Sequence, residues 1–260
     1  MATPEQLIVR NNVDLTDAQI DRFISMLDKF LSINLRKILK ELPTGRDRAL
    51  NAASILLSIR DELNRAGLSS EIAKIDEIYG SQLRSVKDAF DQVKKPGEFY
   101  TETDMKVIEQ IVNFDESIIA NKVYQVTDSL SASLMRQVIT GQRIDIDLAL
   151  EGVSKTTAAQ INTELRTATS GFYQSVTQAK AKEFNVDLFA YVGPNDGIIR
   201  RFCEPRVNKI FTRSQIAKWD NGTDLPASIY RGGYNCRHIF VPITKEKAEK
   251  RVSKGMYQWG

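Results

Sequence analysis

The segment TDMKVIEQIVNFDESIIANKVYQVTDSLSASLMRQVIT (residues 103–140) decides the fold class of this chain. Its apolar residues recur at steps of three and four from Ile108 to Ile139, and no glycine or proline interrupts them before Gly141. This period is typical of an amphipathic α-helix. At about 1.5 Å per residue, one helix of this length would measure roughly 55 Å. The segment therefore predicts a very long helix over residues 103–140, or two helices joined by a kink.

The residues on either side of this segment have the same period. Thr16 and Gln19 form a capping-box pattern, which predicts the start of a first helix that Pro43 ends. Further apolar stripes predict helices over residues 50–67, 69–93 and 154–184. Gly67 and the Pro96-Gly97 pair are expected to end the first two of these, whereas the last one tolerates Gly171 in its middle.

Residues 191–260 differ from the rest of the chain in composition. They contain 13 Lys and Arg against 6 Asp and Glu, a net charge of +7, whereas residues 1–190 contain 23 basic and 27 acidic residues, a net charge of −4. The same 70 residues hold both cysteines, both tryptophans and the one histidine. Such a shift indicates two regions that are built differently.

Short apolar runs between turn signals predict strands in this second region. The expected strands are Leu188–Val192, Lys209–Phe211 and His238–Pro242, and Pro242 favours an edge position for the last one. Thr212 is a predicted N-cap for a short helix over 213–219, and residues 245–253 predict a terminal basic helix. We therefore expect an α+β fold that is predominantly α. An extended helical domain (1–153) would be followed by a small, mixed, turn-rich module (154–260).

Composition excludes several classes of protein. The apolar share of 42% and the charged share of 27% are ordinary for a globular chain, so wholesale disorder is excluded. Two cysteines are too few for a disulfide-dense secreted scaffold, and one histidine is too few for most zinc enzymes. We see no membrane-spanning run and no secretory signal, so a cytoplasmic site of synthesis is expected.

The order of motifs in the second region resembles a known family. A helix with Leu165-Arg166-Thr167-Ala168-Thr169 precedes Asp196 and Arg200-Arg201-Phe202-Cys203, and then come Lys209–Arg213 and Gly232-Gly233-Tyr234-Asn235-Cys236-Arg237-His238. This order resembles the C-terminal region of the phage Mu F-like minor head proteins, the head-morphogenesis family of tailed phages. The resemblance covers about residues 154–243, and the paired RRFC and GGYNCRH motifs are its most specific part. Asp196, Gly232, Gly233, Asn235 and Arg237 would be structural residues of the motif.

The chain also departs from the family pattern. Ala168 stands where the family usually has a glutamate, and Arg206 stands where many members have the second cysteine of a C-x-x-C pair. In those members the four ligands suggest a structural metal. Here the resemblance leaves Cys203, Cys236 and His238 as candidate ligands for zinc, with Asp196 or Glu204 as a conceivable fourth.

Three fates remain open for the two cysteines at this point. They could bind zinc with His238, they could form a disulfide, or they could be buried as small apolar groups. Cys236 and His238 are two residues apart, so their side chains would point the same way in an extended segment. The same spacing seldom gives a nucleophile–base hydrogen bond, and no orienting acid is indicated, so we expect no catalytic site.

Clustered arginines and aromatic residues suggest a contact surface. The candidates are Arg200, Arg201, Arg206, Arg213, Arg231, Trp219 and Tyr234. Such a surface could bind phosphate groups without reading sequence, but arginine is also favoured at protein–protein interfaces, and we favour the protein partner. Arg237, within the tight NCRH segment, is expected to donate hydrogen bonds to nearby carbonyls instead.

The resemblance and the composition together suggest a structural role. We expect a non-enzymatic virion protein, a minor head or head-morphogenesis protein near the portal or neck, which is assembled in the host cytoplasm and present in multiple copies of a symmetric assembly. Its partners would be portal or capsid subunits, with non-specific DNA as a further candidate and no membrane contact, and no cofactor is expected unless zinc binds. The alternatives are a DNA-contacting module with a zinc-knuckle-like tail, a head-to-tail connector, and a Cys-dependent enzyme or toxin-like effector.

Overall fold

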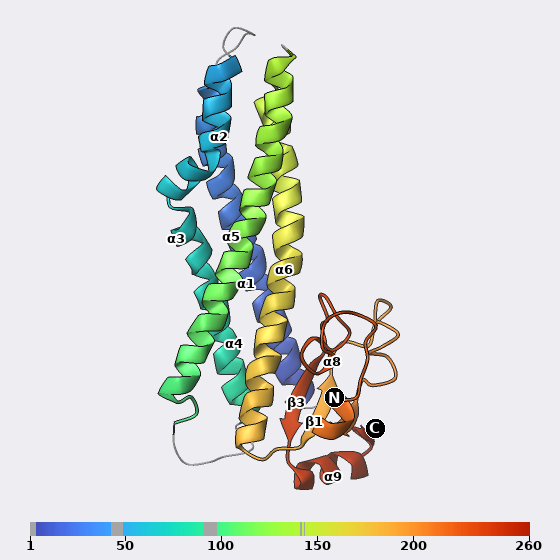
Figure 1. The fold of residues 1–260 in the computed structure, drawn as a ribbon. Coiled ribbons are helices and arrows are strands. Elements are labelled where there is room, and N and C mark those ends of the chain that lie inside the picture. Colours follow the sequence, from blue (N-terminus) through green and yellow to red (C-terminus); the bar gives the residue numbers. More distant parts are fainter. Residues whose placement is uncertain (1–3, 43–48, 91–97, 141, 143) are drawn as a thin grey trace. The chain divides into compact units, whose positions relative to one another are not determined.

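The computed structural model describes residues 4–42, 49–90, 98–140, 142 and 144–260 (Figure 1). The chain forms two compact units, and each is built from segments that are far apart in the sequence. Unit 1 comprises Met1–Gln19, Glu77–Ile111 and Arg166–Gly260, and unit 2 comprises Ile20–Asp76 and Val112–Leu165. The division predicted between residues 153 and 154 stays a prediction.

Helices account for most of the described residues. They are α1 (Pro4–Lys40), α2 (Ala49–Arg65), α3 (Leu68–Ile72), the 3₁₀ turn η2 (Ala73–Ile75), α4 (Asp76–Ala89), α5 (Glu102–Ile139) and α6 (Ile146–Glu183). α5 confirms the very long helix expected over 103–140. α6 begins eight residues before the expected start at residue 154. The predicted helix ends at Pro43, Pro96-Gly97 and Gly141 lie outside the described residues.

Unit 2 is a helical bundle with an apolar core. Many of its buried side chains come from α1, α2, α5 and α6, and they include Ile20, Phe23, Leu27, Leu31, Leu35, Leu56, Ile59, Leu63, Ile119, Val123, Leu130, Leu150 and Ile161. At the edge of this core, Ser131 of α5 donates a hydrogen bond to the Leu56 carbonyl of α2 at 3.1 Å. Burial of the apolar stripes, at about 25 cal/mol per Å², is the main stabilising contribution.

The predicted start of the first helix at Thr16 is wrong, because α1 already begins at Pro4. Thr16 and Gln19 lie inside the helix, where their side chains contact α4 within unit 1. Gln82 donates to the Thr16 hydroxyl, and the Gln19 side chain donates to Ser81 Oγ at 2.9 Å. Residues of a capping-box pattern therefore serve here as polar contacts between helices.

Unit 1 contains a four-stranded sheet in the order β3-β1-β2-β4. Its strands are β1 (Leu188–Val192), β2 (Lys209–Thr212), β3 (Ile239–Ile243) and β4 (Gln258–Trp259). β1 pairs antiparallel with both β2 and β3, and β4 pairs parallel with β2. β3 lies at an edge, where the missing N–H of Pro242 is tolerated. The first three strands match the predicted ones to within one residue at most ends, and β4 was not predicted.

Short helices connect and follow these strands. They are α7 (Arg213–Ile216), α8 (Ala227–Tyr230) and α9 (Lys245–Ser253). Thr212 caps α7 in a complete capping box with Gln215, as expected, and Thr244 caps α9. Long helices combined with this small sheet confirm the predicted fold class, α+β and predominantly α. Among the described helices, none is both long enough and apolar enough to cross a membrane.

A buried lysine ties α5 to α6 within unit 1. Lys180 of α6 is 1% exposed, and its Nζ lies 2.6 Å from Asp104 of α5 and 2.8 Å from Glu183. The rings of Phe99, Tyr100 and Phe184 lie within 6 Å of the same ammonium group. Burial by itself would raise the pKa of Asp104, but the hydrogen bonds from Lys180 and Thr101 outweigh it and lower that pKa.

Replacing Lys180 with methionine should destabilise unit 1 by about 1–3 kcal/mol, because the Asp104 carboxylate loses its buried partner. Since the pKa of Asp104 is lowered in the folded state, this contribution is complete at neutral pH and disappears as the pH falls below about 4. Urea unfolding followed by tryptophan fluorescence would measure the difference, because Trp219 and Trp259 both lie in unit 1. Lys182→Met, at an exposed position of the same helix, is the control. An equal loss at both positions, or a loss independent of pH, would contradict this role.

Candidate functional site

The motif residues of the second region meet around a turn with unusual backbone angles. After α8, Arg231, Gly233 and Asn235 have φ values of 51°, 90° and 54°. Left-handed φ is costly for non-glycine residues, and such strain often accompanies functional sites. The Asn235 amide donates to Thr167 Oγ1 of α6 at 3.3 Å, which fixes the turn against the helix. This turn delivers Cys236 and His238 to the start of β3.

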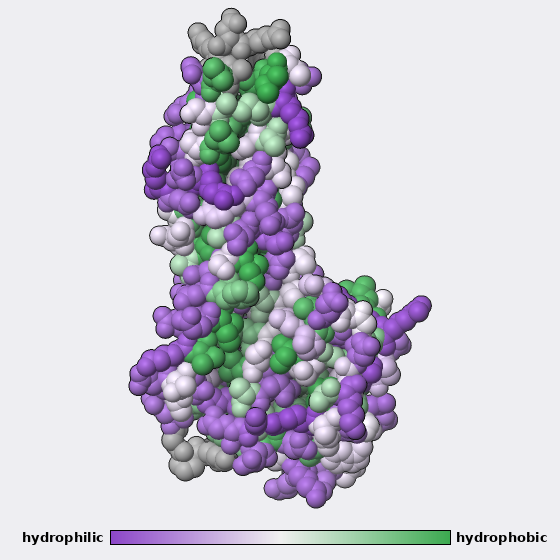
Figure 2. Space-filling view, viewed as in Figure 1, coloured by the Kyte–Doolittle hydropathy of each residue, from purple (hydrophilic) through white to green (hydrophobic). Residues whose placement is uncertain are grey.

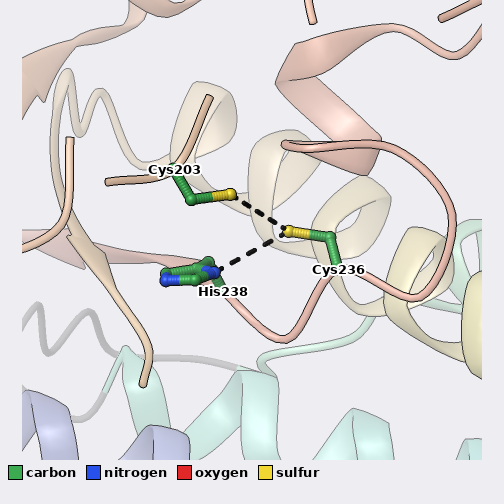
Figure 3. A group of neighbouring side chains, drawn as sticks. All are labelled: Cys203, Cys236 and His238. Atoms are coloured by element: carbon green, nitrogen blue, oxygen red, sulfur yellow. Dashed lines mark hydrogen bonds between the residues drawn. The ribbon is translucent and has the colours of Figure 1, made fainter. Parts of the chain in front are cut away.

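Cys203, Cys236 and His238 form one buried cluster, and Figure 3 shows their ligand atoms pointing toward one another. The two Sγ atoms are 3.8 Å apart, and Cys236 Sγ lies 3.9 Å from Nδ1 of His238. All three ligand atoms lie within 4.8 Å of one another. The cysteines are free thiols. The structure thus brings together the three candidate ligands named from the sequence, and metal binding by them stays a prediction.

The pKa values of the two thiols are shifted in opposite directions. The hydrogen bond between Cys203 and Cys236 lowers the pKa of Cys236 against the effect of burial, and His238 and the Arg231 guanidinium act in the same direction. The pKa of Cys203 is raised by the same hydrogen bond and by the burial of its side chain. The Gly232 amide also donates to Cys236 Sγ at 3.4 Å, and the Tyr191 hydroxyl donates to Cys203 Sγ at 3.2 Å. The cluster therefore favours a thiolate at Cys236.

The walls of the cluster are close-packed. The His238 ring stacks on Tyr191, with ring centroids 5.3 Å apart and an interplanar angle of 4°. A Cβ at Gly193 would lie 2.4 Å from the His238 ring, and a Cβ at Gly232 would lie 2.7 Å from Cys203 Sγ. Glycine is therefore required at both positions for the cluster to close. His238 Nε2 is buried and has no hydrogen-bond partner among the described residues.

The donor set suits a thiophilic metal but does not complete a closed zinc site. Structural zinc sites use four ligands in a tetrahedron, and the described residues bring three ligand atoms together. Asp196, one conceivable fourth ligand, is held by Arg237 through two contacts of 2.8 Å. Glu204, the other, is exposed and does not belong to the cluster. Among the described residues, the four-ligand set that the resemblance implies is therefore incomplete.

Arg231 lies inside unit 1, where it is 1% exposed, and so it is not available at a contact surface. Its Nε donates to the His238 carbonyl at 2.8 Å. Its Nη atoms donate to the carbonyls of Ser170, Ile229 and Cys236 and to the Ser170 hydroxyl. All five guanidinium donors are thereby used, mostly by backbone oxygens, and they join α6, α8 and the segment that leads into β3.

Other predicted arginines also turn toward the protein. Arg200 donates to the carbonyls of Gly232 and Tyr234 and so clamps two loops together. Arg213 donates to the Val186 carbonyl at 2.6 Å. Arg237 pairs with the Asp196 carboxylate, whose pKa it lowers, rather than with the carbonyls that we expected.

Trp219 and Arg206 belong to one aromatic cluster. The guanidinium carbon of Arg206 lies 4.0 Å from the Phe202 ring centroid and 4.7 Å from that of Trp219. The Trp219 ring is also within 6 Å of Tyr191, Phe211 and Phe240. Trp219 is therefore a half-buried packing residue. Of the predicted contact residues, Arg200, Arg201 and Tyr234 are exposed, although the Arg200 guanidinium is held by the two carbonyls named above.

Two residues that position the cluster were not predicted from the sequence. Ser170 accepts hydrogen bonds from Arg231 at both its hydroxyl and its carbonyl, and Tyr191 contacts both Cys203 and His238. Ser170 lies one turn after Arg166-Thr167 on the same helix, and Tyr191 is the fourth residue of β1. Their positions carry a weak signal, since nothing local distinguishes them from other residues of α6 and β1.

Comparison with known proteins adds no identification. No family model, no curated protein and no solved structure matches this chain.

Proposed function

We propose that this chain is a structural virion protein of a tailed phage, a minor head or head-morphogenesis protein that contacts portal or capsid subunits. The proposal rests on the resemblance of the paired RRFC and GGYNCRH motifs. One structural observation supports it: the motif residues bind one another. Arg200 holds Gly232 and Tyr234, Asp196 holds Arg237, and Cys203 meets Cys236. Residues used in this way build a rigid scaffold.

Exposed apolar side chains support a role in protein contacts. In unit 2 the pairs Met26/Ile33 and Leu50/Leu57 are exposed at a spacing of seven residues on α1 and α2, and unit 1 exposes Ile198 and Tyr234. Hydrophobic residues are also visible among the hydrophilic ones on the face drawn in Figure 2. Apolar side chains at heptad spacing are suited to packing against further helices. A protein partner is favoured over DNA, because most of the predicted arginines are engaged within unit 1.

The proposal predicts that the chain is a stoichiometric component of assembled particles. Quantitative mass spectrometry of purified particles, from the phage whose genome encodes the chain, should find it in multiple copies. Cryo-electron microscopy should place it at the portal vertex. Density in the neck instead would favour the connector alternative. Absence of the chain from intact particles would overturn the proposal.

A variant pair separates assembly from folding. Ile198→Ala/Tyr234→Ala should reduce incorporation into particles with an unchanged circular dichroism spectrum, because both side chains are exposed. Cys236→Ser particles address the enzyme alternative. If they assemble and infect normally, a Cys-dependent activity is excluded, whereas loss of infectivity with normal assembly would support it. Salt-dependent binding of duplex DNA by the purified chain would support the DNA-contacting alternative.

A further inference from the structure

We propose that Cys203, Cys236 and His238 form a three-coordinate site for one monovalent thiophilic cation, Cu(I), rather than an incomplete zinc site. The ligand atoms are the two Sγ atoms and Nδ1 of His238. Thiolate sulfur with imidazole nitrogen is a soft donor set, which both Cu(I) and zinc accept. The choice between the two ions depends on the number of ligands, the space around them and the charge of the surroundings.

The three ligand atoms form a triangle of suitable size. Its known edges are 3.8 and 3.9 Å, and its third edge is at most 4.8 Å. The point equidistant from the three atoms therefore lies at most about 2.5 Å from each of them, close to the length of a metal–sulfur bond. An ion in the plane of the triangle can bind all three atoms with little movement of the side chains. A tetrahedral zinc ion lies out of that plane and needs a fourth ligand on its open side.

The surroundings leave little room for a fourth ligand. Cys203, Cys236 and His238 are 0%, 6% and 3% exposed. The backbone at Gly232 closes the sulfur side, since a Cβ there would lie 2.7 Å from Cys203 Sγ and 3.4 Å from Cys236 Sγ. Among the residues that the structure describes, no further Cys, His, Asp or Glu joins the group. Three-coordination is the geometry that this packing permits.

The charge next to the site favours a monovalent ion. The Arg231 guanidinium is buried beside the cluster and donates to the carbonyls of Cys236 and His238. Its partners in the described residues are carbonyl and hydroxyl oxygens, so its positive charge has to be balanced by the cluster. Metal binding deprotonates both thiols. Two thiolates, Arg231 and one Cu(I) sum to zero, whereas Zn(II) would leave one net positive charge in the interior, which is costly.

Two hydrogen-bond donors of the protein contact the sulfur atoms, and they agree with this balance of charges. The Gly232 amide and the Tyr191 hydroxyl each donate to one of the sulfur atoms. Hydrogen bonds of this kind stabilise anionic sulfur and tune a bound metal from the second layer of residues. Two thiolates carry one more negative charge than a monovalent ion neutralises. These two donors and Arg231 stabilise that remaining negative charge.

Competition titrations with the full-length chain would test this site. The protein would be prepared metal-free and reduced with a phosphine under anaerobic conditions. We expect it to remove one Cu(I) per chain from the Cu(I)–bicinchoninate complex, with an ultraviolet thiolate-to-copper absorption band. Zn(II), measured against a colorimetric zinc chelator, should bind about a hundredfold more weakly or not at all. X-ray absorption of the copper-loaded protein should give two sulfur ligands and one nitrogen ligand.

Variants assign the binding to the cluster. Cys203→Ser and His238→Gln should each weaken Cu(I) binding by about a hundredfold or more, whereas Glu204→Gln, at the exposed carboxylate outside the cluster, should not change it. If circular dichroism shows that Arg231→Met is folded, the ratio of its affinities for Cu(I) and Zn(II) should be smaller than that of the wild type. Preference for Zn(II) by the wild-type chain, or absence of Cu(I) binding by the folded wild-type chain, would overturn the proposal. None of these outcomes depends on whether the chain is a virion protein.

Discussion

Replacing Arg231 with methionine should destabilise unit 1 by about 3–5 kcal/mol. Methionine fills a similar volume, but it removes five hydrogen-bond donors from a buried position. The carbonyls of Ser170, Ile229, Cys236 and His238 would then be left without these donors. A buried carbonyl that loses its donor costs more free energy than one hydrogen bond contributes. We therefore expect a loss of stability at the upper end of the range for a single substitution. Urea unfolding monitored by tryptophan fluorescence would measure it.

The control for Arg231 is Arg201→Met, an equal change of charge and shape at an exposed position. It should alter the free energy of unfolding by less than about 0.5 kcal/mol. Arg231→Lys should retain little of the lost stability, because an ammonium group cannot donate hydrogen bonds to the same set of oxygens. If Arg231→Met is as stable as the wild type, the guanidinium is not the link between α6, α8 and β3.

Elements with local signals could be predicted from the sequence. β1 and α9 have the predicted bounds, and Thr212 caps α7 as expected. In each case the signal lies within a few residues: an apolar run before a turn cluster, or a hydroxyl residue before a helix. Gly67, expected at a helix end, has a φ of 101°, which a residue with a side chain rarely adopts. Such signals depend on the backbone alone and need no distant partner.

Elements that depend on distant partners could not be predicted in the same way. β4 has two residues, and it is a strand because Gln258 and Trp259 pair with Lys209 and Ile210. Nothing local distinguishes it from a loop end. The capping-box pattern at Thr16 gave a wrong helix start because a distant partner is involved there too. The helix continues through the pattern, and its side chains bind residues of α4 instead of capping the helix.

In the candidate site too, some residues could be predicted from the sequence and others depend on distant partners. The resemblance singled out Cys203, Cys236 and His238 as candidate metal ligands, and Cys236 and His238 lie two residues apart just before β3. The arginines were misleading, since charge predicts exposure for most residues of this type. Arg231 is buried because carbonyls from α6, from α8 and from the segment before β3 converge on it, and Ser170 is 61 residues away. The sequence contains no sign of that convergence.

Replacing Gly171 with alanine should destabilise unit 1 by about 1–3 kcal/mol, although alanine is normally the better residue inside a helix by about 1 kcal/mol. The reason is the approach of α8 to α6. A Cβ at position 171 would lie 2.6 Å from Cε1 of Tyr230 and 3.1 Å from its Cζ. The ring has to move, and Tyr230 directly precedes Arg231, so this shift would also disturb the hydrogen bonds of that arginine.

Gly80→Ala is the matched control for Gly171→Ala. It lies inside α4, also in unit 1, and a Cβ there would meet a single atom of the flexible Arg84 side chain at 3.8 Å. This substitution should stabilise unit 1 by about 0.5–1 kcal/mol through helix propensity alone. The two variants are therefore expected to differ in sign, as read from the midpoints of urea unfolding. In a Tyr230→Ala background Gly171→Ala should lose its penalty, because the colliding ring is gone. A stabilising Gly171→Ala in the wild-type background would mean that α8 does not pack against α6 as the structure has it.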